Sequence, residues 1–282
     1  MSDSFATPLR YPGGKGRLGA WLSELISYND LTEGCYIEPY AGGAGAAMYL
    51  LAQKKIDRVV INDIDPIIYS FWWAVLNDNE NFQNLIINTP LDIGQWHAQK
   101  EVICSPSSHS LTEVGFASFF LNRTNRSGII KGGVIGGQKQ QGKYKIDARF
   151  NRTGLAKRVN SIGKLRDKIS LYNLDAIELI NKIGDNKKNL YYLDPPYYKK
   201  GEQLYRNSYK NEDHINVAET VKNLSSPWLV TYDNCSEILQ IYDWDKSFEF
   251  SLYYSTHLSR PIGKEICFFN GIDIHKEIYL KR

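Results

Sequence analysis

Four short apolar runs, each ending at an acidic residue, constrain the fold of this chain more than any other feature of its sequence. The runs and their acidic ends are residues 35–38 with Glu38, 58–62 with Asp63, 169–173 with Asp175, and 189–193 with Asp194. Helical patterns follow the first three runs. Strands that alternate with helices in this way form a parallel sheet covered by helices. We therefore predict an α/β fold.

The alternation stops between the second and third runs. Residues 79–100 and 111–121 carry helical patterns, and no apolar strand separates them. We interpret this insertion as a separate, mostly helical lobe over residues 79–168, and residues 1–78 with 169–282 as the sheet domain. The remaining predicted strands are residues 228–231 and an antiparallel pair, 248–253 with 265–270.

Positive charge is concentrated in the second half of the predicted lobe. Residues 122–168 hold thirteen Lys or Arg and two Asp, a net charge of +11, whereas the whole chain carries only +3. The bases alternate with Gly and Gln in GIIKGGVIGGQKQQGKYK, which favours a loop over a helix. Such a concentration is typical of contact with a polyanion such as nucleic acid. A solvated basic face without a partner is the alternative interpretation.

A glycine-rich turn, AGGAG, follows the first predicted strand. Ligands of open α/β sheets bind at such strand ends, where glycine lets the backbone approach closely. Asp63 follows Gly42 by 21 residues, at the end of the next strand, where a carboxylate can accept hydrogen bonds from ribose hydroxyls. The full GxGxxG pattern is absent, because Met48 occupies its last position. The turn could therefore bind a dinucleotide, bind another adenosine ligand, or hold no ligand.

The sequence YYLDPPYY predicts a rigid loop directly after the fourth strand. The two prolines fix their own φ angles and donate no hydrogen bond, so the carbonyls of Asp194 and Pro195 are free to accept. An amino group on a planar base could donate to the Asp194 carboxylate and the Pro195 carbonyl while the base stacks on Tyr197. The alternative is an ordinary proline-rich turn with surface tyrosines.

A third loop, RYPGGKGRL, lies near the N-terminus. Its glycines and Lys15 suggest closure over an anionic or carboxylate group. The Walker A pattern GxxxxGK[ST] is not satisfied, which disfavours kinase or ATPase chemistry.

Taken together, PGGK, EPYAGGAG, NDID and DPPY resemble, in this order, the motifs of the Dam-type DNA adenine-N6 methyltransferases of the α group. This resemblance implies a Rossmann-like methyltransferase sheet with an inserted, mostly helical DNA-recognition lobe. It also implies S-adenosylmethionine as the cofactor and double-stranded DNA as the partner. The target adenine would be flipped out of the duplex, because its amino group cannot be reached inside the stack.

The resemblance assigns roles residue by residue. The implied catalytic residues are Asp194, Pro195, Pro196 and Tyr197. The implied cofactor-binding residues are Tyr11, Gly13, Gly14, Lys15, Glu38, Pro39, Tyr40, Gly43, Asp63, Ile64, Asp175, Ala176 and Asp194. The candidates for DNA contact in the basic lobe are Arg123, Arg126, Lys139, Arg149 and Arg152. No metal is implied.

Other features narrow the class of protein. No apolar run approaches the roughly 18 residues that span a bilayer, and the first residues lack the apolar core of a signal peptide, so we expect a cytoplasmic protein without a membrane partner. The four cysteines are far apart and form no CxxC pair. We therefore expect reduced thiols rather than a zinc site or disulfides. A monomer that acts with a cognate restriction endonuclease is a further expectation.

Three alternative functions fit parts of the sequence. An RNA adenine-N6 methyltransferase would share the cofactor loop and a related tetrapeptide. A non-catalytic DNA-binding module would keep the fold without the chemistry. A nicotinamide-dependent oxidoreductase would explain the glycine loop and Asp63 but would leave DPPY and the basic segment unused.

Overall fold

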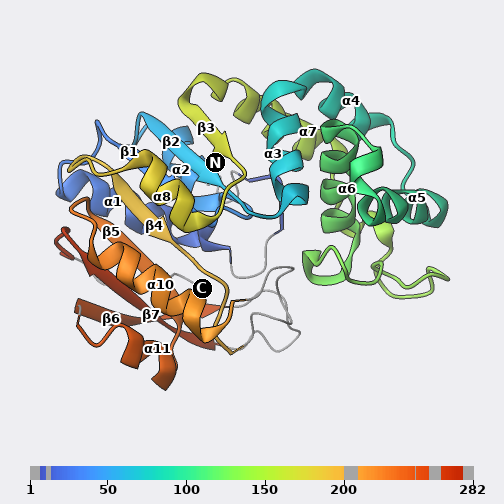
Figure 1. The fold of residues 1–282 in the computed structure, drawn as a ribbon. Coiled ribbons are helices and arrows are strands. Elements are labelled where there is room, and N and C mark those ends of the chain that lie inside the picture. Colours follow the sequence, from blue (N-terminus) through green and yellow to red (C-terminus); the bar gives the residue numbers. More distant parts are fainter. Residues whose placement is uncertain (1–6, 11–13, 200–208, 245, 254–261, 276–282) are drawn as a thin grey trace.

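The computed structural model describes residues 7–10, 14–199, 209–244, 246–253 and 262–275 (Figure 1). It contains a seven-stranded sheet with the order β3-β2-β1-β4-β5-β7-β6. The strands are β1 (Cys35–Glu38), β2 (Arg58–Asn62), β3 (Ile169–Tyr172), β4 (Leu190–Leu193), β5 (Trp228–Asp233), β6 (Lys246–Tyr253) and β7 (Ile262–Asn270). Strands β1 to β5 pair in parallel, and β7 pairs antiparallel with both β5 and β6. The predicted α/β fold is confirmed.

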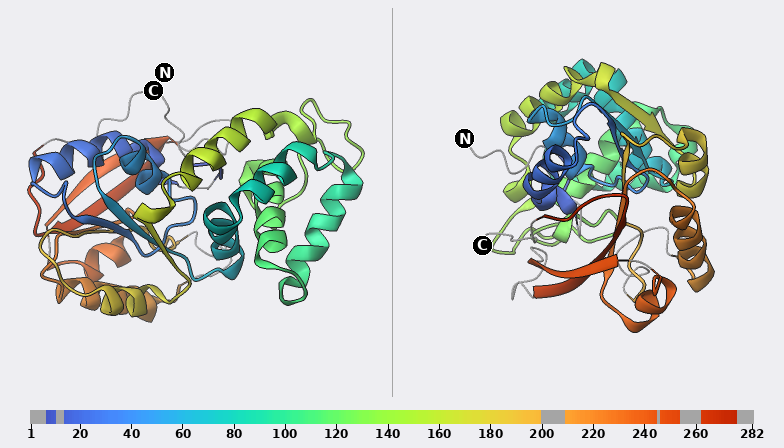
Figure 2. Two further views of the ribbon diagram at one scale, coloured as in Figure 1. Left: turned by 90° about the horizontal axis from the view of Figure 1, so that it is seen from above. Right: turned by 90° about the vertical axis from the view of Figure 1, so that its left-hand side faces the viewer.

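Helices cover both faces of the sheet and build a lobe beside it (Figure 2). The α-helices are α1 (Gly19–Tyr28), α2 (Gly45–Ala52), α3 (Pro66–Asn77), α4 (Asn79–Asn88), α5 (Ile93–Cys104), α6 (Leu111–Thr124), α7 (Arg152–Gly163), α8 (Ala176–Ile183), α10 (Asn211–Lys222) and α11 (Ser236–Ile241). In the part of the chain that the structure describes, no helix is long and apolar enough to cross a membrane.

The two faces of the sheet belong to two hydrophobic clusters, because successive strand residues point to opposite sides. In β1, Tyr36 packs into the cluster that contains α1 and α2, whereas Ile37 packs into the cluster that contains α8, α10 and α11. In β4, Tyr192 and Tyr191 divide in the same way. Both strands are therefore buried on both faces, which explains their nearly continuous apolar sequence.

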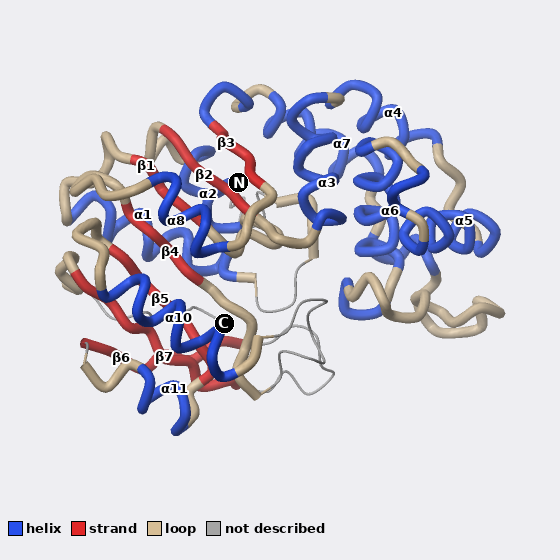
Figure 3. Tube along the Cα trace, viewed as in Figure 1, coloured by secondary structure: helices blue, strands red, loops and turns tan. Residues whose placement is uncertain are grey.

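The helical lobe is continuous with the core of the sheet through α3. Phe71 of α3 stacks on Phe119 of α6 with ring centroids 6.1 Å apart, and both residues belong to the same cluster as β1. The Asp65 side chain begins α3 by accepting a hydrogen bond from the Ile67 amide. Figure 3 shows the lobe as a group of helices next to the strands. The division of the chain at residues 78 and 168 stays a prediction.

A proline interrupts the helical stretch predicted over residues 79–100. Two helices, α4 and α5, cover this stretch and are separated by residues 89–92. Thr89 is extended (φ −64°, ψ 128°) because the following Pro90 disfavours the helical conformation before it. Asp92 then begins α5 by accepting a hydrogen bond from the Gln95 amide at 2.7 Å. Helices α6 and α7 are joined by a long segment with only short 3-10 turns, as its glycine-rich composition predicts.

Gly115 allows α6 to lie directly on the backbone of α3. A Cβ atom at this position would lie 2.4 Å from the carbonyl oxygen of Ser70. We expect Gly115→Ala to lower the free energy of unfolding by about 1–2 kcal/mol, because the cost of overpacking exceeds the gain in helix propensity. The matched control is Gly94→Ala in α5, where a Cβ atom meets only ordinary contact with Asp92. Urea denaturation checks both variants, and equal stabilities would contradict the tight contact between α3 and α6.

Candidate active site

The site lies where the loops after β1 and β4 meet at the carboxyl edge of the sheet. β1 pairs with β2 on one side and with β4 on the other, so the connections after β1 and β4 leave the edge in different directions. Such a point is the usual ligand-binding crevice of an open α/β sheet. Three loops converge there: residues 14–18, the glycine-rich loop after Glu38, and the DPPY loop.

The Asp63 carboxylate stabilises the glycine-rich loop by hydrogen bonds to backbone amides. The Gly42 amide donates to Asp63 Oδ2 at 2.9 Å, and Asp63 Oδ1 accepts from the Asp65 amide at 2.9 Å. The Gly42 carbonyl accepts from the indole of Trp72 in α3 at 2.9 Å. The loop turns through left-handed conformations at Gly42 (φ 47°) and Ala44 (φ 42°). These contacts shape the end of β1 into a tight turn that leads into α2.

Asp63 and Ile64 directly follow β2 at the carboxyl edge of the sheet. Burial raises the pKa of the half-buried Asp63 carboxyl to about 7. Ile64 is 47% exposed, although it is a large apolar side chain. Asn173 donates to the carbonyl oxygens of both residues and so ties the end of β2 to the end of β3. A carboxylate beside an exposed apolar side chain fits an adenosine group, whose ribose donates hydrogen bonds and whose base is flat and apolar.

The remaining predicted cofactor residues differ in exposure. Glu38, Pro39, Gly43 and Ala176 are buried, whereas Tyr40 and Asp175 are half-buried. Glu38 Oε1 accepts from the Ala47 amide at 3.2 Å, and burial raises the pKa of this carboxyl to about 8. Asp175 begins α8 by accepting from the Ile177 and Glu178 amides.

Tyr209 joins this group, although sequence reasoning did not select it. Its hydroxyl lies 3.0 Å from the hydroxyl of Tyr40, and burial raises its pKa to about 12. The ring of Tyr209 also packs against His214 in α10, with ring centroids 5.4 Å apart. Tyr209 therefore joins the end of β1 to α10 through its contacts with Tyr40 and His214.

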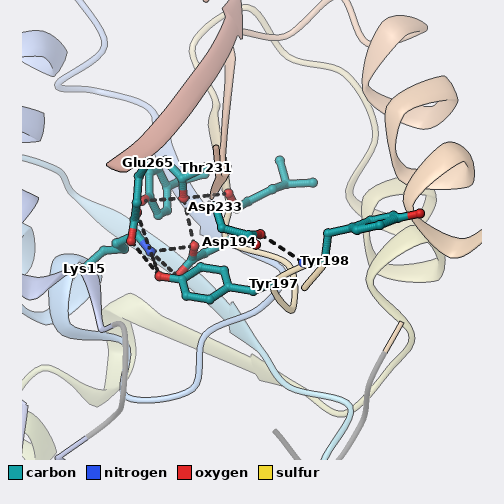
Figure 4. A network of polar contacts seen from close by, with 9 residues as sticks. Lys15, Asp194, Tyr197, Tyr198, Thr231, Asp233 and Glu265 are labelled. Carbon is teal, nitrogen blue, oxygen red and sulfur yellow. Dashed lines mark hydrogen bonds and ion pairs between the residues drawn. The ribbon is translucent and has the colours of Figure 1, made fainter. Parts of the chain in front are cut away.

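The structure places the Lys15 side chain against the DPPY loop. Lys15 Nζ donates to Asp194 Oδ1 at 2.8 Å and to Oδ2 at 3.1 Å, and the residue is 5% exposed (Figure 4). A Cβ atom at Gly45 would lie 2.9 Å from the Cα of Gly16, so the loop that carries Lys15 packs directly on the start of α2. Gly14 is exposed. Tyr11 and Gly13 lie outside the described residues.

Asp194 stands at the end of β4 in a polar cluster. Besides Lys15, it accepts from Thr231 Oγ1 of β5 at 2.8 Å. Burial raises the pKa of the Asp194 carboxyl above its ordinary value; Lys15 lowers it and the carboxylate of Glu265 raises it. Burial alone would lower the pKa of the Lys15 ammonium, but Asp194 and Glu265 together raise it well above its usual range. Lys15 is therefore an ammonium that two carboxylates share.

The other residues of DPPY line the same cluster. Pro195 is buried and Pro196 half-buried. Tyr197 is 3% exposed, and its hydroxyl donates to Glu265 Oε1 at 2.6 Å. Tyr198 is half-buried, its amide donates to Asp233 Oδ1 at 2.9 Å, and its hydroxyl donates to Asn211. Stacking of a base on Tyr197 stays a prediction.

Sequence reasoning also missed Thr231 and Glu265. Both lie on strands that were predicted correctly, and both face Asp194 or Lys15 from the sheet. The available signal was a lone acidic residue in the apolar run EICFF of β7. A charged side chain inside such a run is either exposed or paired in the core, and β7 is flanked by strands on both sides. In the described residues, no group of three or more His, Cys, Asp or Glu could hold a metal ion.

The five basic candidates fall into two groups. Arg126, Lys139 and Arg149 are exposed. Arg123 is buried and donates from both Nε and Nη2 to the carbonyl of Pro8, and burial lowers its pKa to about 9. Arg152 is half-buried and donates to the carbonyls of Ile86, Ile87 and Thr89. Arg123 and Arg152 thus hold protein backbone, and DNA contact by either residue stays a prediction that these internal bonds disfavour.

The chain resembles several known proteins. Residues 11–259 match the family of D12 class N6 adenine-specific DNA methyltransferases. The type II methyltransferase M.MjaIII of Methanocaldococcus jannaschii is 24% identical over 235 residues, which cover 77% of this chain and 79% of that protein.

Two solved structures align with this chain at low scores. A Legionella pneumophila protein of the family DUF519 has 11% identity and a TM-score of 0.36, covering 97% of this chain and 88% of its own. The rRNA methyltransferase aviRa from Streptomyces viridochromogenes has 12% identity and a TM-score of 0.34, covering 88% and 82%. These scores are too low to show a shared fold.

Substitution of Arg123 tests whether its buried contact with Pro8 stabilises the fold. We expect Arg123→Ala to lower the free energy of unfolding by about 1–3 kcal/mol, because the Pro8 carbonyl loses a buried donor. Lys139→Ala, the matched surface control, should change stability by less than about 0.5 kcal/mol. Thermal and urea denaturation measure both. Equal stability of the two variants would show that the Arg123 contact with Pro8 contributes nothing.

Proposed function

The chain belongs to the D12 class N6 adenine-specific DNA methyltransferases, and we propose that it transfers a methyl group from S-adenosylmethionine to N6 of a flipped-out adenine in double-stranded DNA. The observation that carries the proposal is the position of Asp194. Its carboxylate lies at the end of β4, beside the glycine-rich turn after β1, and Lys15 and Thr231 hold it from two sides. A donor of the methyl group in the β1 crevice and an acceptor at Asp194 would therefore lie at neighbouring strand ends.

The residues around the crevice suit S-adenosylmethionine. We assign the ribose to the Asp63 carboxylate, the adenine to the exposed face of Ile64 with Asp175, and the methionine end to the turn that contains Gly43. When bound, S-adenosylmethionine supplies an electrophilic methyl group on sulfur. The left-handed turn at Gly42 lets the backbone approach this ligand closely.

Asp194 performs the acid–base and electrostatic work in the proposed reaction. The amino group of adenine donates a hydrogen bond to the carboxylate. Positive charge grows on N6 as the methyl group is transferred, and a fixed carboxylate in a site of low dielectric stabilises that charge strongly. The same carboxylate then accepts the proton that N6 releases. The Pro195 carbonyl is a second acceptor in the same loop.

Two features support DNA as the partner. Adenine must leave the stack to reach Asp194, and Tyr197 with Tyr198 offers aromatic rings on the DPPY loop for the extruded base. The exposed side chains of Arg126, Lys139 and Arg149 lie in the segment between α6 and α7, where they can bind phosphates or the edges of DNA bases.

The central test is loss of the Asp194 carboxylate. We expect Asp194→Ala to lower the rate of methyl transfer by at least about 100- to 1,000-fold, because charge on N6 loses its acceptor. Binding of S-adenosylmethionine should persist. Unmethylated genomic DNA is incubated with protein and cofactor, and modified bases are located by sequencing. Methyladenine at one short motif with the wild type, and none with the variant, is the expected result. Near-normal turnover by the variant would refute the role of Asp194.

The proposed ribose contact predicts a pH dependence. Because the pKa of Asp63 is about 7 rather than its ordinary value near 3.8, the carboxyl of the free protein is mostly protonated below pH 7. A ribose hydroxyl donates to the carboxylate form, so affinity for S-adenosylmethionine should rise about 10-fold from pH 6 to pH 8.

Calorimetry at these two pH values checks the prediction. In Asp63→Asn the contribution of Asp63 to the rise in affinity should disappear. Any pH dependence that comes from the titratable groups of S-adenosylmethionine itself should be the same in both proteins. Parallel affinity curves for the wild type and the variant would contradict the contact between Asp63 and the ribose.

A further inference from the structure

Two buried carboxylates share the ammonium of Lys15. Nζ lies 2.8 Å from Asp194 Oδ1 and 3.2 Å from Glu265 Oε2, and the side chains of Lys15, Asp194 and Glu265 are 4%, 17% and 0% exposed. With all three groups ionised, the cluster carries a net charge of −1. Figure 4 shows Glu265 in one network of polar contacts with Lys15, Asp194 and Tyr197.

Glu265 also fixes the tyrosine of the DPPY loop. Its Oε1 accepts from the Tyr197 hydroxyl at 2.6 Å, while the Lys15 ammonium lies 3.4 Å from the same hydroxyl and 5.3 Å from the centre of the Tyr197 ring. A single carboxylate on β7 therefore contacts both the N-terminal loop and the catalytic loop.

The Lys15 ammonium competes with the amine of the target base for the oxygens of Asp194, and Glu265 relieves this competition. Lys15 occupies both oxygens of Asp194, which are the atoms that the amino group of adenine needs. If Asp194 were the sole partner of Lys15, the approaching amine would either meet a neutral ion pair or leave a buried ammonium unpaired, which is costly. With Glu265 present, the ammonium keeps a carboxylate partner when the amine takes an oxygen of Asp194. The net negative charge also remains next to N6, where positive charge grows.

We propose that Glu265 is a positioning residue for methyl transfer, which holds the Lys15 ammonium and the Tyr197 hydroxyl so that Asp194 stays available to the amine of the target base. The inference rests on the proposed function. It concerns a residue outside the DPPY loop and outside every cofactor role assigned above. A buried ionic cluster contributes little net stability compared with well-packed apolar residues, so the arrangement is better explained by chemistry than by folding.

The test is a double-mutant cycle on Lys15 and Glu265. Single-turnover methyl transfer is measured at saturating S-adenosylmethionine and DNA for the wild type, Glu265→Gln, Lys15→Met and the double variant. We expect Glu265→Gln to be about 10- to 100-fold slower, because the groups around the acceptor lose their alignment. Cofactor affinity and KM for DNA should change little.

The cycle distinguishes positioning from a merely structural role. If Glu265 acts through Lys15, the double variant is no slower than the slower single variant, whereas independent roles would multiply the two losses. Glu249→Gln is the matched control, because Glu249 lies opposite Ile266 on the neighbouring strand β6 and is exposed. If Glu265→Gln does not fold, Glu265→Asp replaces it in the cycle. This variant keeps the charge but loses the reach to one partner, so an intermediate loss is expected.

The outcomes separate the two proposals. Turnover of Glu265→Gln within about twofold of the wild type, or losses that multiply in the double variant, would overturn the role of Glu265 and leave the proposed function intact. Absence of methyl transfer in both the wild type and Glu249→Gln would instead refute the proposed function.

Discussion

The ion pair between Lys15 and Asp194 joins two parts of the chain that are 179 residues apart in sequence, and the geometry of the site depends on it. A buried ammonium requires carboxylate partners, so three separate elements must be brought into register: the loop before α1, the end of β4, and β7. The loop is placed by the glycine contact between Gly16 and Gly45 at the start of α2. β7 is placed by its antiparallel pairing with β5, where Glu265 lies opposite Asp233. Because β7 lies between β5 and β6, the Glu265 carboxylate lies next to the Lys15 ammonium.

Because β1 to β5 run parallel, the loops that follow them lie at one edge of the sheet, although the chain segments between the strands differ widely in length. β2 and β3 are neighbours in the sheet, yet the chain between them builds the whole helical lobe. The lobe does not disturb the edge, because α3 buries its apolar side in the same cluster as β1 and because Trp72 holds the Gly42 carbonyl. The helix that begins the lobe thus also supports the glycine-rich turn of the crevice.

Much of the fold could be predicted from the sequence, because apolar runs and their acidic ends are local signals. The seven strands lie close to the residues predicted for them, whereas the bounds of the inserted lobe stay a prediction. The break at Pro90 was missed because the helical pattern of apolar residues continues on both sides of it. Exposure was harder to predict: charge counting cannot distinguish Lys139 on the surface from Arg123 in the interior. The role of Glu265 has no local signal beyond a single acidic residue in an apolar strand, since its partners are set by the pairing of β7.

One basic residue of the segment 122–168, Arg123, is buried and holds protein backbone. Residues 7–10 lie on the helical lobe: the Arg10 amide donates to Asn122, whose own side chain donates back to the Arg10 carbonyl, and Arg123 holds the Pro8 carbonyl. A few residues further along the chain, Lys15 binds Asp194. Residues 7–10 are therefore bonded to the lobe, and Lys15 is bonded to Asp194. Because α6 supplies both Asn122 and Arg123, the charge of Arg123 serves to hold the backbone before α1 rather than to face solvent.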